Sequence, residues 1–206
     1  MKVDRPPPGE ELTEGEITPA RQAATLVLLL DTPEGPEVLL VQRNPQQRFM
    51  GGAWVFPGGA LHGEDADLPA AAVRELAEEA AIALPAGTEL VSWSRWITPQ
   101  EVKVRFDTWF FVAEAPTGAE ARPDGGECVD ARWLRPAAAL EAHRRDELML
   151  VFPTIKHLEA LATFDSVGSA LEAARRRAVV PVQPRILVRD GSAEVLLPGE
   201  PGYPEE

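Results

Sequence analysis

Cysteine, basic residues and long apolar runs are all scarce in this sequence of 206 residues. The single cysteine, Cys128, excludes a disulfide within the chain, which fits a reducing compartment. The longest largely apolar run, 23–30, is far shorter than the roughly 20 residues of a transmembrane helix. The N-terminal residues lack the basic-then-apolar order of a secretory signal. We therefore expect a cytoplasmic protein that does not bind membranes.

Lysine and arginine number 20 against 33 aspartates and glutamates, which gives a net charge of −13. This charge argues against nucleic acid as the main partner, because nucleic acids attract positive surfaces. A small polyanionic substrate is compatible with it, since a bound metal ion can supply positive charge locally. Chain length indicates one domain with an appendage. The oligomeric state is left open, a homodimer included.

Hydrophobic patterning and turn residues predict a mixed chain of strands and helices. Strands are predicted at 23–31, 38–42, 53–56, 90–97, 102–112 and 128–134. Helices are predicted at 68–84, where Asp67 caps and Pro85 ends the helix, and at 136–145, 154–163 and 166–177. A last hairpin joins 185–188 to 194–197 through Asp190-Gly191. We expect a flexible segment at 1–19, a domain at 20–150, and an extension at 151–206 that packs on the same domain.

The helix predicted at 68–84 carries an acidic cluster. With about 100° per residue, one face holds Arg74, Glu75, Glu78 and Glu79. The expected buried stripe on the other side consists of Val73, Leu76, Ala77, Ala80 and Ala83. Like charges at helical spacing repel one another, so the cluster needs a compensating partner.

Two partners for these acids follow from their chemistry. Arg74 can pair with one or two carboxylates, and a hard divalent cation would bind the rest through oxygen. A solvated acidic helix face is the alternative. Gly58 and Gly59 lie just upstream and favour the cation, because backbone without side chains can approach a metal or a phosphate closely.

The segment from Gly59 to Ile82 resembles the Nudix box, the motif of hydrolases that act on nucleoside diphosphates linked to another group. Its core is Arg74-Glu75-Leu76-Ala77-Glu78-Glu79, preceded by Phe56-Pro57-Gly58-Gly59. Asp65 stands at the position of the box's first glutamate, one extra residue separates it from Arg74, and Ala81 replaces the last glycine. The resemblance implies a Nudix fold, an α/β/α sandwich in which the box helix and additional C-terminal helices flank a mixed sheet.

The resemblance also implies a Mg²⁺ or Mn²⁺ site. Its expected ligands are Glu75, Glu78 and Glu79, with the carbonyl of Gly58 as an additional ligand. Arg74 would orient the glutamates, and Glu79 would also be catalytic. Glu127 stands six residues before Trp133, at the place of a further acid in the family. It is a candidate metal ligand or general base, and the alternative is a loop carboxylate in a glycine-rich turn.

Within the family, the extra residue between Asp65 and Arg74 is similar to the box of the branch that cleaves coenzyme A. Residues Leu39, Leu40, Arg43, Arg48 and Gly52 have the spacing of a segment that precedes the box in that branch, whereas His62 stands where aspartate is usual. Further similarity lies in Trp96-Ile97-Thr98-Pro99, Arg105-Phe106-Asp107-Thr108, Trp133-Leu134 and Phe152-Pro153-Thr154. The implied reaction converts coenzyme A or an acyl derivative to 3′,5′-ADP and 4′-phosphopantetheine.

Coenzyme A carries a 3′-phosphate, for which Arg48, Lys103 and Arg105 are candidate partners. An ion pair with Asp107 on the same strand face is the alternative for Arg105. The candidates for stacking on adenine are Phe49, Trp54, Trp93 and Trp96. ADP-ribose or a dinucleotide such as NADH is the alternative substrate. A non-catalytic Nudix-fold binding module is the alternative to an enzyme, and loss of the acidic residues would have favoured it.

Overall fold

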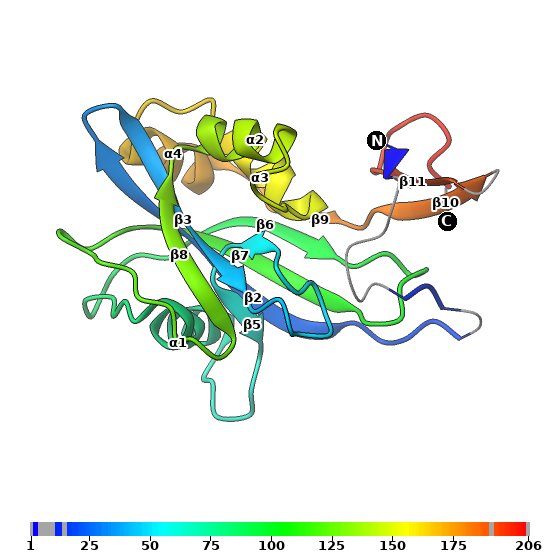
Figure 1. Ribbon diagram of the computed structural model, residues 1–206, viewed down its shortest axis with the longest axis horizontal. Coiled ribbons are helices and arrows are strands. Elements are labelled where there is room, and N and C mark those ends of the chain that lie inside the picture. Colours follow the sequence, from blue (N-terminus) through cyan, green and yellow to red (C-terminus); the bar gives the residue numbers. More distant parts are fainter. Residues whose placement is uncertain (1, 4–10, 14–15, 190–191, 205–206) are drawn as a thin grey trace.

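The computed structural model describes residues 2–3, 11–13, 16–189 and 192–204 (Figure 1). Its main sheet has the strand order β4-β3-β2-β7-β6-β9, while β5 also pairs with β2 and β8 with β3. These strands are β2 (Arg21–Thr32), β3 (Gly35–Arg43), β4 (Trp54–Val55), β5 (Gly58–Ala60), β6 (Val91–Ile97), β7 (Phe106–Glu114), β8 (Cys128–Leu134) and β9 (Pro181–Val182). A smaller sheet contains β1 (Lys2–Val3), β11 (Ser192–Leu196) and β10 (Arg185–Arg189).

Helices cover both faces of the main sheet (Figure 1). Helix α1 (Leu68–Ala80) lies on one face, and α2 (Pro136–Arg144), α3 (Phe152–Leu161) and α4 (Val167–Arg176) lie on the other. The predicted sandwich of helices around a mixed sheet is therefore confirmed.

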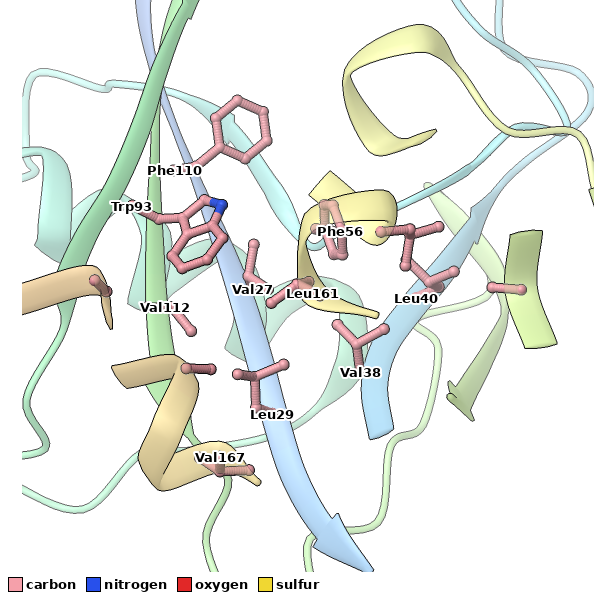
Figure 2. Packing of buried hydrophobic residues seen from close by; sticks show 14 of the residues in the cluster. Val27, Leu29, Val38, Leu40, Phe56, Trp93, Phe110, Val112, Leu161 and Val167 are labelled. Atoms are coloured by element: carbon pink, nitrogen blue, oxygen red, sulfur yellow. The ribbon is translucent and has the colours of Figure 1, made fainter. Parts of the chain in front are cut away.

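Side chains of β2 alternate between the two faces, as the pleat of a strand requires. Leu26 and Leu28 pack in one apolar cluster with Leu76 of α1. Val27 and Leu29 pack in the other with residues of α3 and α4, including Leu161 and Val167 (Figure 2). Two cores thus share one sheet, and the C-terminal helices complete the second.

Strand β2 changes its partner along one edge. It pairs with β3 over Leu29–Thr32 and with β5 over Ala23–Thr25. The opposite edge pairs in parallel with β7 from Arg21 to Leu29, so β3 and β5 occupy the same edge. Beyond this pairing β3 continues along β8 and β4. A gap therefore separates β3 from β5 along this edge of β2.

The structure corrects several predicted boundaries. Helix α1 ends at Ala80 rather than at Leu84, because Ala81 takes a left-handed conformation with φ 55°. Pairing of β7 begins at Phe106, and within the predicted strand Val102 forms only an isolated bridge with Leu12. The short strands β5 and β9 were not predicted.

Parts of the predicted chain ends lie outside the described residues, namely 1, 4–10 and 14–15 of the N-terminal segment and the turn Asp190-Gly191. Two described residues of the N-terminal segment pair with the loop after β6. The Lys103 N–H donates to the Glu11 carbonyl, and the Thr13 N–H donates to the Glu101 carbonyl, both at 2.8 Å. Among the helices of the described ranges, none combines the length and the apolar character that a bilayer crossing requires.

Replacing Ala81 with glycine should stabilise the protein. A left-handed residue with a Cβ is strained by roughly 1–2 kcal/mol, part of which the larger unfolded-state entropy of glycine offsets. Ala81 is exposed, so no packing is lost. We expect Ala81→Gly to raise the free energy of unfolding by about 0.5–1 kcal/mol, measured by urea denaturation. Ala77→Gly, at an exposed position within the helix, should instead lower it by about 1 kcal/mol. A destabilised Ala81→Gly protein would contradict the strain.

His157 of α3 is buried between the helix and the sheet, with 3 % of its surface exposed. Its ring stacks on Phe110 with a centroid distance of 4.2 Å. Nδ1 lies 2.6 Å from the carbonyl oxygen of Pro153, and Nε2 lies 2.6 Å from the Ser94 hydroxyl. Because a carbonyl only accepts, Nδ1 carries the proton and Nε2 accepts from Ser94. Burial lowers the pKa of His157 to about 4.

Stability should therefore decrease as the pH falls from about 6.5 to about 4. In this window the unfolded imidazole gains a proton that the folded one does not take up. We expect the stability advantage of the wild type over His157→Gln to be constant above pH 6.5 and to shrink by about 3 kcal/mol at pH 4. Urea denaturation at a series of pH values measures both proteins. A difference that does not depend on pH would contradict a neutral buried histidine.

Candidate active site

A cavity of about 400 Å³ opens where β3 and β5 separate. Its floor is the sheet face that bears Ala23, Thr25 and Thr108, and α3 contributes Pro153 and Thr154. The ionisable side chains in its lining are those of Arg21, Arg43, His62, Glu75, Glu78, Glu79 and Glu127. Acidic groups of α1 therefore reach a cavity that otherwise lies on the opposite face of the sheet.

Two glycines of β5 make this approach sterically feasible. A Cβ on Gly59 would lie 2.2 Å from Oε1 of Glu75, so any side chain there would require the Glu75 carboxylate to move. A Cβ on Gly58 would lie 2.5 Å from the Thr25 hydroxyl and 2.6 Å from the Ala24 carbonyl oxygen. The glycine pair thus brings bare backbone into contact with both α1 and β2.

Two of the three glutamates that the helical wheel placed opposite the buried stripe are themselves buried, so that part of the prediction was wrong. Glu75 and Glu79 are 7 % and 3 % exposed, and only Glu78 faces solvent. The buried stripe of α1 consists of Ala71, Ala72, Glu75, Leu76, Glu79 and Ala80. Of the predicted stripe, Val73 is half-buried, and Ala77 and Ala83 are exposed. The stripe is rotated because β5 and Cys128 cover the side of the helix that bears the two glutamates.

Arg74 fixes the position of the acidic side chains. Its Nε and Nη2 donate to the two oxygens of Asp65 at 2.9 and 3.0 Å, and Nη2 also donates to the Ala60 carbonyl at 3.1 Å. Nη1 donates to Glu75 and to Glu78, each at 2.9 Å. The hydrogen bonds from Arg74 lower the pKa of Asp65 to about 2. Asp65 is thus the anchor of Arg74, and Arg74 joins the loop, β5 and α1.

Glu79 is the most enclosed of the acids. Its Oε2 accepts a hydrogen bond from the Gly58 N–H at 2.9 Å, and the buried Cys128 thiol lies beside its carboxylate. Burial raises the pKa of Glu79 to about 7, and burial likewise raises the pKa of Glu75. Both carboxylates are therefore poorly stabilised in their ionised form by the protein alone.

Glu127 lies at the rim of the cavity, in the loop before β8. Asp124 shapes this loop, because its carboxylate accepts from the backbone N–H groups of Gly126, Glu127 and Cys128 at 2.8–3.0 Å. The Glu127 carbonyl accepts from the Asn44 N–H at 2.8 Å, which joins the loop to the end of β3. Its exposed carboxylate is therefore carried on a loop with a defined backbone.

The donor set fits a hard divalent cation. In the described part of the chain, no three histidine, cysteine or acidic side chains already form a ligand cluster. Instead, Arg74 contacts Glu75 and Glu78, and the Gly58 N–H contacts Glu79. The available donors are carboxylate oxygens, the ligands that Mg²⁺ and Mn²⁺ prefer. Positive charge in the cavity would stabilise the ionised forms that burial disfavours.

The three basic residues predicted to bind substrate lie outside the cavity lining. Arg48 and Lys103 contact the two oxygens of the Glu11 carboxylate at 3.2 and 3.3 Å, and all three side chains are exposed. Arg105 is 8 % exposed and donates to the backbone carbonyls of Thr98 and Thr18. The structure thus brings Arg48 and Lys103 together and separates Arg105 from them.

The alternative partner predicted for Arg105 was wrong. Asp107 pairs with Arg95 on β6, with Arg95 Nε 2.8 Å from Oδ1, and it also accepts from Gln22 at 2.9 Å. Arg105 precedes the first paired residue of β7, so the alternation of that strand does not place it on the face of Asp107.

Several residues of the cavity lining were not predicted as site residues. Arg43 belongs to a predicted motif without a role of its own, yet it lines the cavity and donates to the Phe49 carbonyl at 3.3 Å. Phe49 is the one aromatic stacking candidate in this lining, whereas Trp54 and Trp93 are buried in the core (Figure 2 shows Trp93). His62 was noted only as a departure from a motif, and no motif marked Arg21.

Comparison with known proteins identifies relatives of this chain. The NUDIX domain family model matches residues 20–151. The uncharacterized Nudix hydrolase NudL of Klebsiella aerogenes is 52 % identical over 62 residues, which are 30 % of this chain and 51 % of NudL. The human acyl-coenzyme A diphosphatase NUDT19 is 31 % identical over 122 residues, 57 % of this chain and 32 % of NUDT19. These matches span about half or less of each relative.

A solved structure supports the same relationship. The NUDIX hydrolase from Alicyclobacillus acidocaldarius is 29 % identical to this chain, with a TM-score of 0.67 over 76 % of this chain and 97 % of the other. The NUDIX domain of Shewanella oneidensis NrtR, crystallised with ADP ribose, is 21 % identical with a TM-score of 0.57 and shares the fold.

Substitution of Arg74 should destabilise the protein, because its removal leaves Asp65 and Glu75 without a cationic partner. We expect Arg74→Ala to lower the melting temperature by several degrees. The matched control is Arg122→Ala, which removes an exposed ion pair with Glu120 and should leave the melting temperature unchanged. Equal melting temperatures for the wild type and Arg74→Ala would show that Arg74 does not organise the acidic cluster.

Proposed function

This chain belongs to the Nudix family of hydrolases, enzymes that act on diphosphate bonds, and we propose that its substrate is coenzyme A or an acyl derivative of it. The products would be 3′,5′-ADP and 4′-phosphopantetheine, with the acyl group retained on the latter. The observation that carries this proposal is the similarity over 122 residues to a relative named an acyl-coenzyme A diphosphatase. The cavity supports it, because Arg21 and Arg43 line it beside the acidic cluster.

We propose that Mg²⁺ or Mn²⁺ is held by Glu75, Glu78 and Glu79, together with the Gly58 carbonyl and Glu127. Nudix hydrolases generally use divalent metals, and these oxygen ligands all belong to residues that line the cavity. When bound, such an ion supplies positive charge that neutralises the diphosphate and makes a nearby water more acidic.

The protein side chains would position and deprotonate the attacking water. Arg74 holds Glu75 and Glu78 through Nη1, so these two carboxylates keep a fixed spacing. The Gly58 N–H holds one oxygen of Glu79, which orients that carboxylate toward the cavity. Glu79 or Glu127 would accept the proton of the water, and single variants of each acid distinguish the two assignments.

Arg48 and Lys103 would bind the 3′-phosphate. Both already contact one carboxylate, that of Glu11, and a phosphate presents the same kind of anionic oxygens. In this proposal the phosphate displaces Glu11 from between the two cations. Arg105 would act indirectly, by holding the cavity wall at Thr98, and Phe49 would stack on the adenine.

Glutamine at position 79 should lower turnover by about two to three decades without harming the fold. The amide retains an acceptor for the Gly58 N–H and removes a charge that burial disfavours, so the metal-free protein should be equally or more stable. Loss of a catalytic carboxylate of this kind typically lowers the rate by about 10²–10³. Turnover and thermal melting of Glu79→Gln test both parts. Wild-type turnover at saturating Mg²⁺ would show that α1 does not carry the active site.

A panel of diphosphates tests the substrate. Under one set of Mg²⁺ conditions we expect coenzyme A to be cleaved with a kcat/KM about one to two decades above that of dephospho-coenzyme A, because each charge-assisted hydrogen bond to the 3′-phosphate contributes about 1.5–3 kcal/mol. Chromatography identifies the products. The proposal fails if ADP-ribose or NADH is cleaved tenfold better than both coenzyme A forms.

Two variants refine the same measurement. Lys103→Ala should reduce the ratio of kcat/KM for coenzyme A to that for dephospho-coenzyme A. Glu11→Gln should lower the KM for coenzyme A but not for dephospho-coenzyme A, because it removes the charge that competes with the 3′-phosphate. Arg176→Ala, which removes an exposed ion pair on α4, is the control and should change neither substrate. An unchanged ratio in Lys103→Ala would remove Lys103 from the site.

A further inference from the structure

A second, smaller pocket of about 120 Å³ adjoins the cavity, and Phe49, Thr108 and Phe110 line both. The described residues that line it include no charged side chain. Its outer wall comes from the C-terminal hairpin, through Ile186 and Val195. The pocket is therefore an apolar extension of the cavity, closed by a segment that lies outside the matched NUDIX domain.

The two strands of the hairpin present one surface to this pocket. Ile186 of β10 and Val195 of β11 are directly paired, so their side chains lie on the same face of the hairpin. The hairpin is attached near the end of β6, where Glu101 accepts from Arg185 Nε at 2.7 Å and from the Ile186 N–H at 3.2 Å (Figure 1). The hairpin is thus held beside the pocket by hydrogen bonds to Glu101.

The distance between the acidic cluster and the pocket follows from the strand pairing. A row of paired residues, Ala60, Ala23, Thr108 and Trp96, crosses the sheet from β5 to β6. Three spacings of about 4.8 Å separate its ends by roughly 14 Å. Ala60 is held by Arg74, and Trp96 lines the apolar pocket.

This distance matches the length of the pantetheine arm. From phosphorus to sulfur the arm has about thirteen bonds, which in extended form span roughly 15 Å at the advance of an extended polypeptide. An arm that starts at the acidic cluster and follows the row therefore brings its sulfur to the pocket. Whatever is bonded to that sulfur would enter apolar surroundings.

We propose that this pocket binds the acyl group of a coenzyme A thioester, and that the hairpin β10–β11 selects its length. The inference rests on the coenzyme A substrate proposed above. An apolar cavity of about 150 Å³ accommodates the six carbons of benzene, so this one takes an acyl chain of about four or five carbons.

Kinetics with a series of thioesters test the inference. Each buried methylene should raise kcat/KM about fourfold, so butanoyl-coenzyme A should exceed acetyl-coenzyme A by about fifteenfold. The gain should stop once the pocket is filled. Ile186→Trp fills the pocket and should reduce the butanoyl-to-acetyl ratio to below threefold. Leu187→Trp adds the same bulk on the other face of β10 and should retain the ratio.

Ile186→Ala gives an independent measurement, because it enlarges the pocket and should move the preferred chain from butanoyl toward hexanoyl. Thermal melting confirms that each variant is folded. If coenzyme A is cleaved but all acyl derivatives have the same kcat/KM in the wild type, the acyl pocket is disproved and the proposed function stands. If neither coenzyme A nor its thioesters are cleaved, both fail.

Discussion

The close contact between α1 and the glycine strand β5 is the constraint on which the site depends. Glu75 lies where a Cβ of Gly59 would be, and Glu79 accepts from the Gly58 N–H. This contact places carboxylates from one face of the sheet in a cavity on the other. A side chain at Gly59 would displace the Glu75 carboxylate from this contact.

The same contact makes the site a local conflict with stability. Two carboxylates are buried, and their pKa values are raised, so the fold itself does not favour their ionised forms. Arg74 offsets part of this penalty, and Asp65 in turn holds Arg74 in place. A positively charged ligand would offset more of it. Violation of the ordinary burial rule at one point in a consistent fold is typical of a functional site.

Local sequence patterns predicted the helices and strands well, but they did not predict which side chains of α1 are buried. The box helix and most strands follow from periodicity, whereas the burial of Glu75 and Glu79 comes from the approach of β5, which no helical wheel contains. The strand pattern placed Arg105 wrongly because β7 begins only at Phe106, the residue after it. The meeting of Arg48 with Lys103 depends on Glu11, a contact between distant parts of the chain. The missing information is in each case tertiary.

The proposed function assigns reaction and selectivity to different parts of this chain. In that proposal the box residues would face the diphosphate, a group that coenzyme A, ADP-ribose and NADH all contain, so they could not distinguish one of these substrates from another. Groups able to distinguish substrates come from elsewhere: the basic pair at Glu11, and the hairpin wall of Ile186 and Val195. Because the hairpin lies beyond the matched domain, its residues can change without altering the acidic cluster. In the proposed function, residues outside the acidic cluster would therefore determine substrate choice, whereas the fold determines the chemistry.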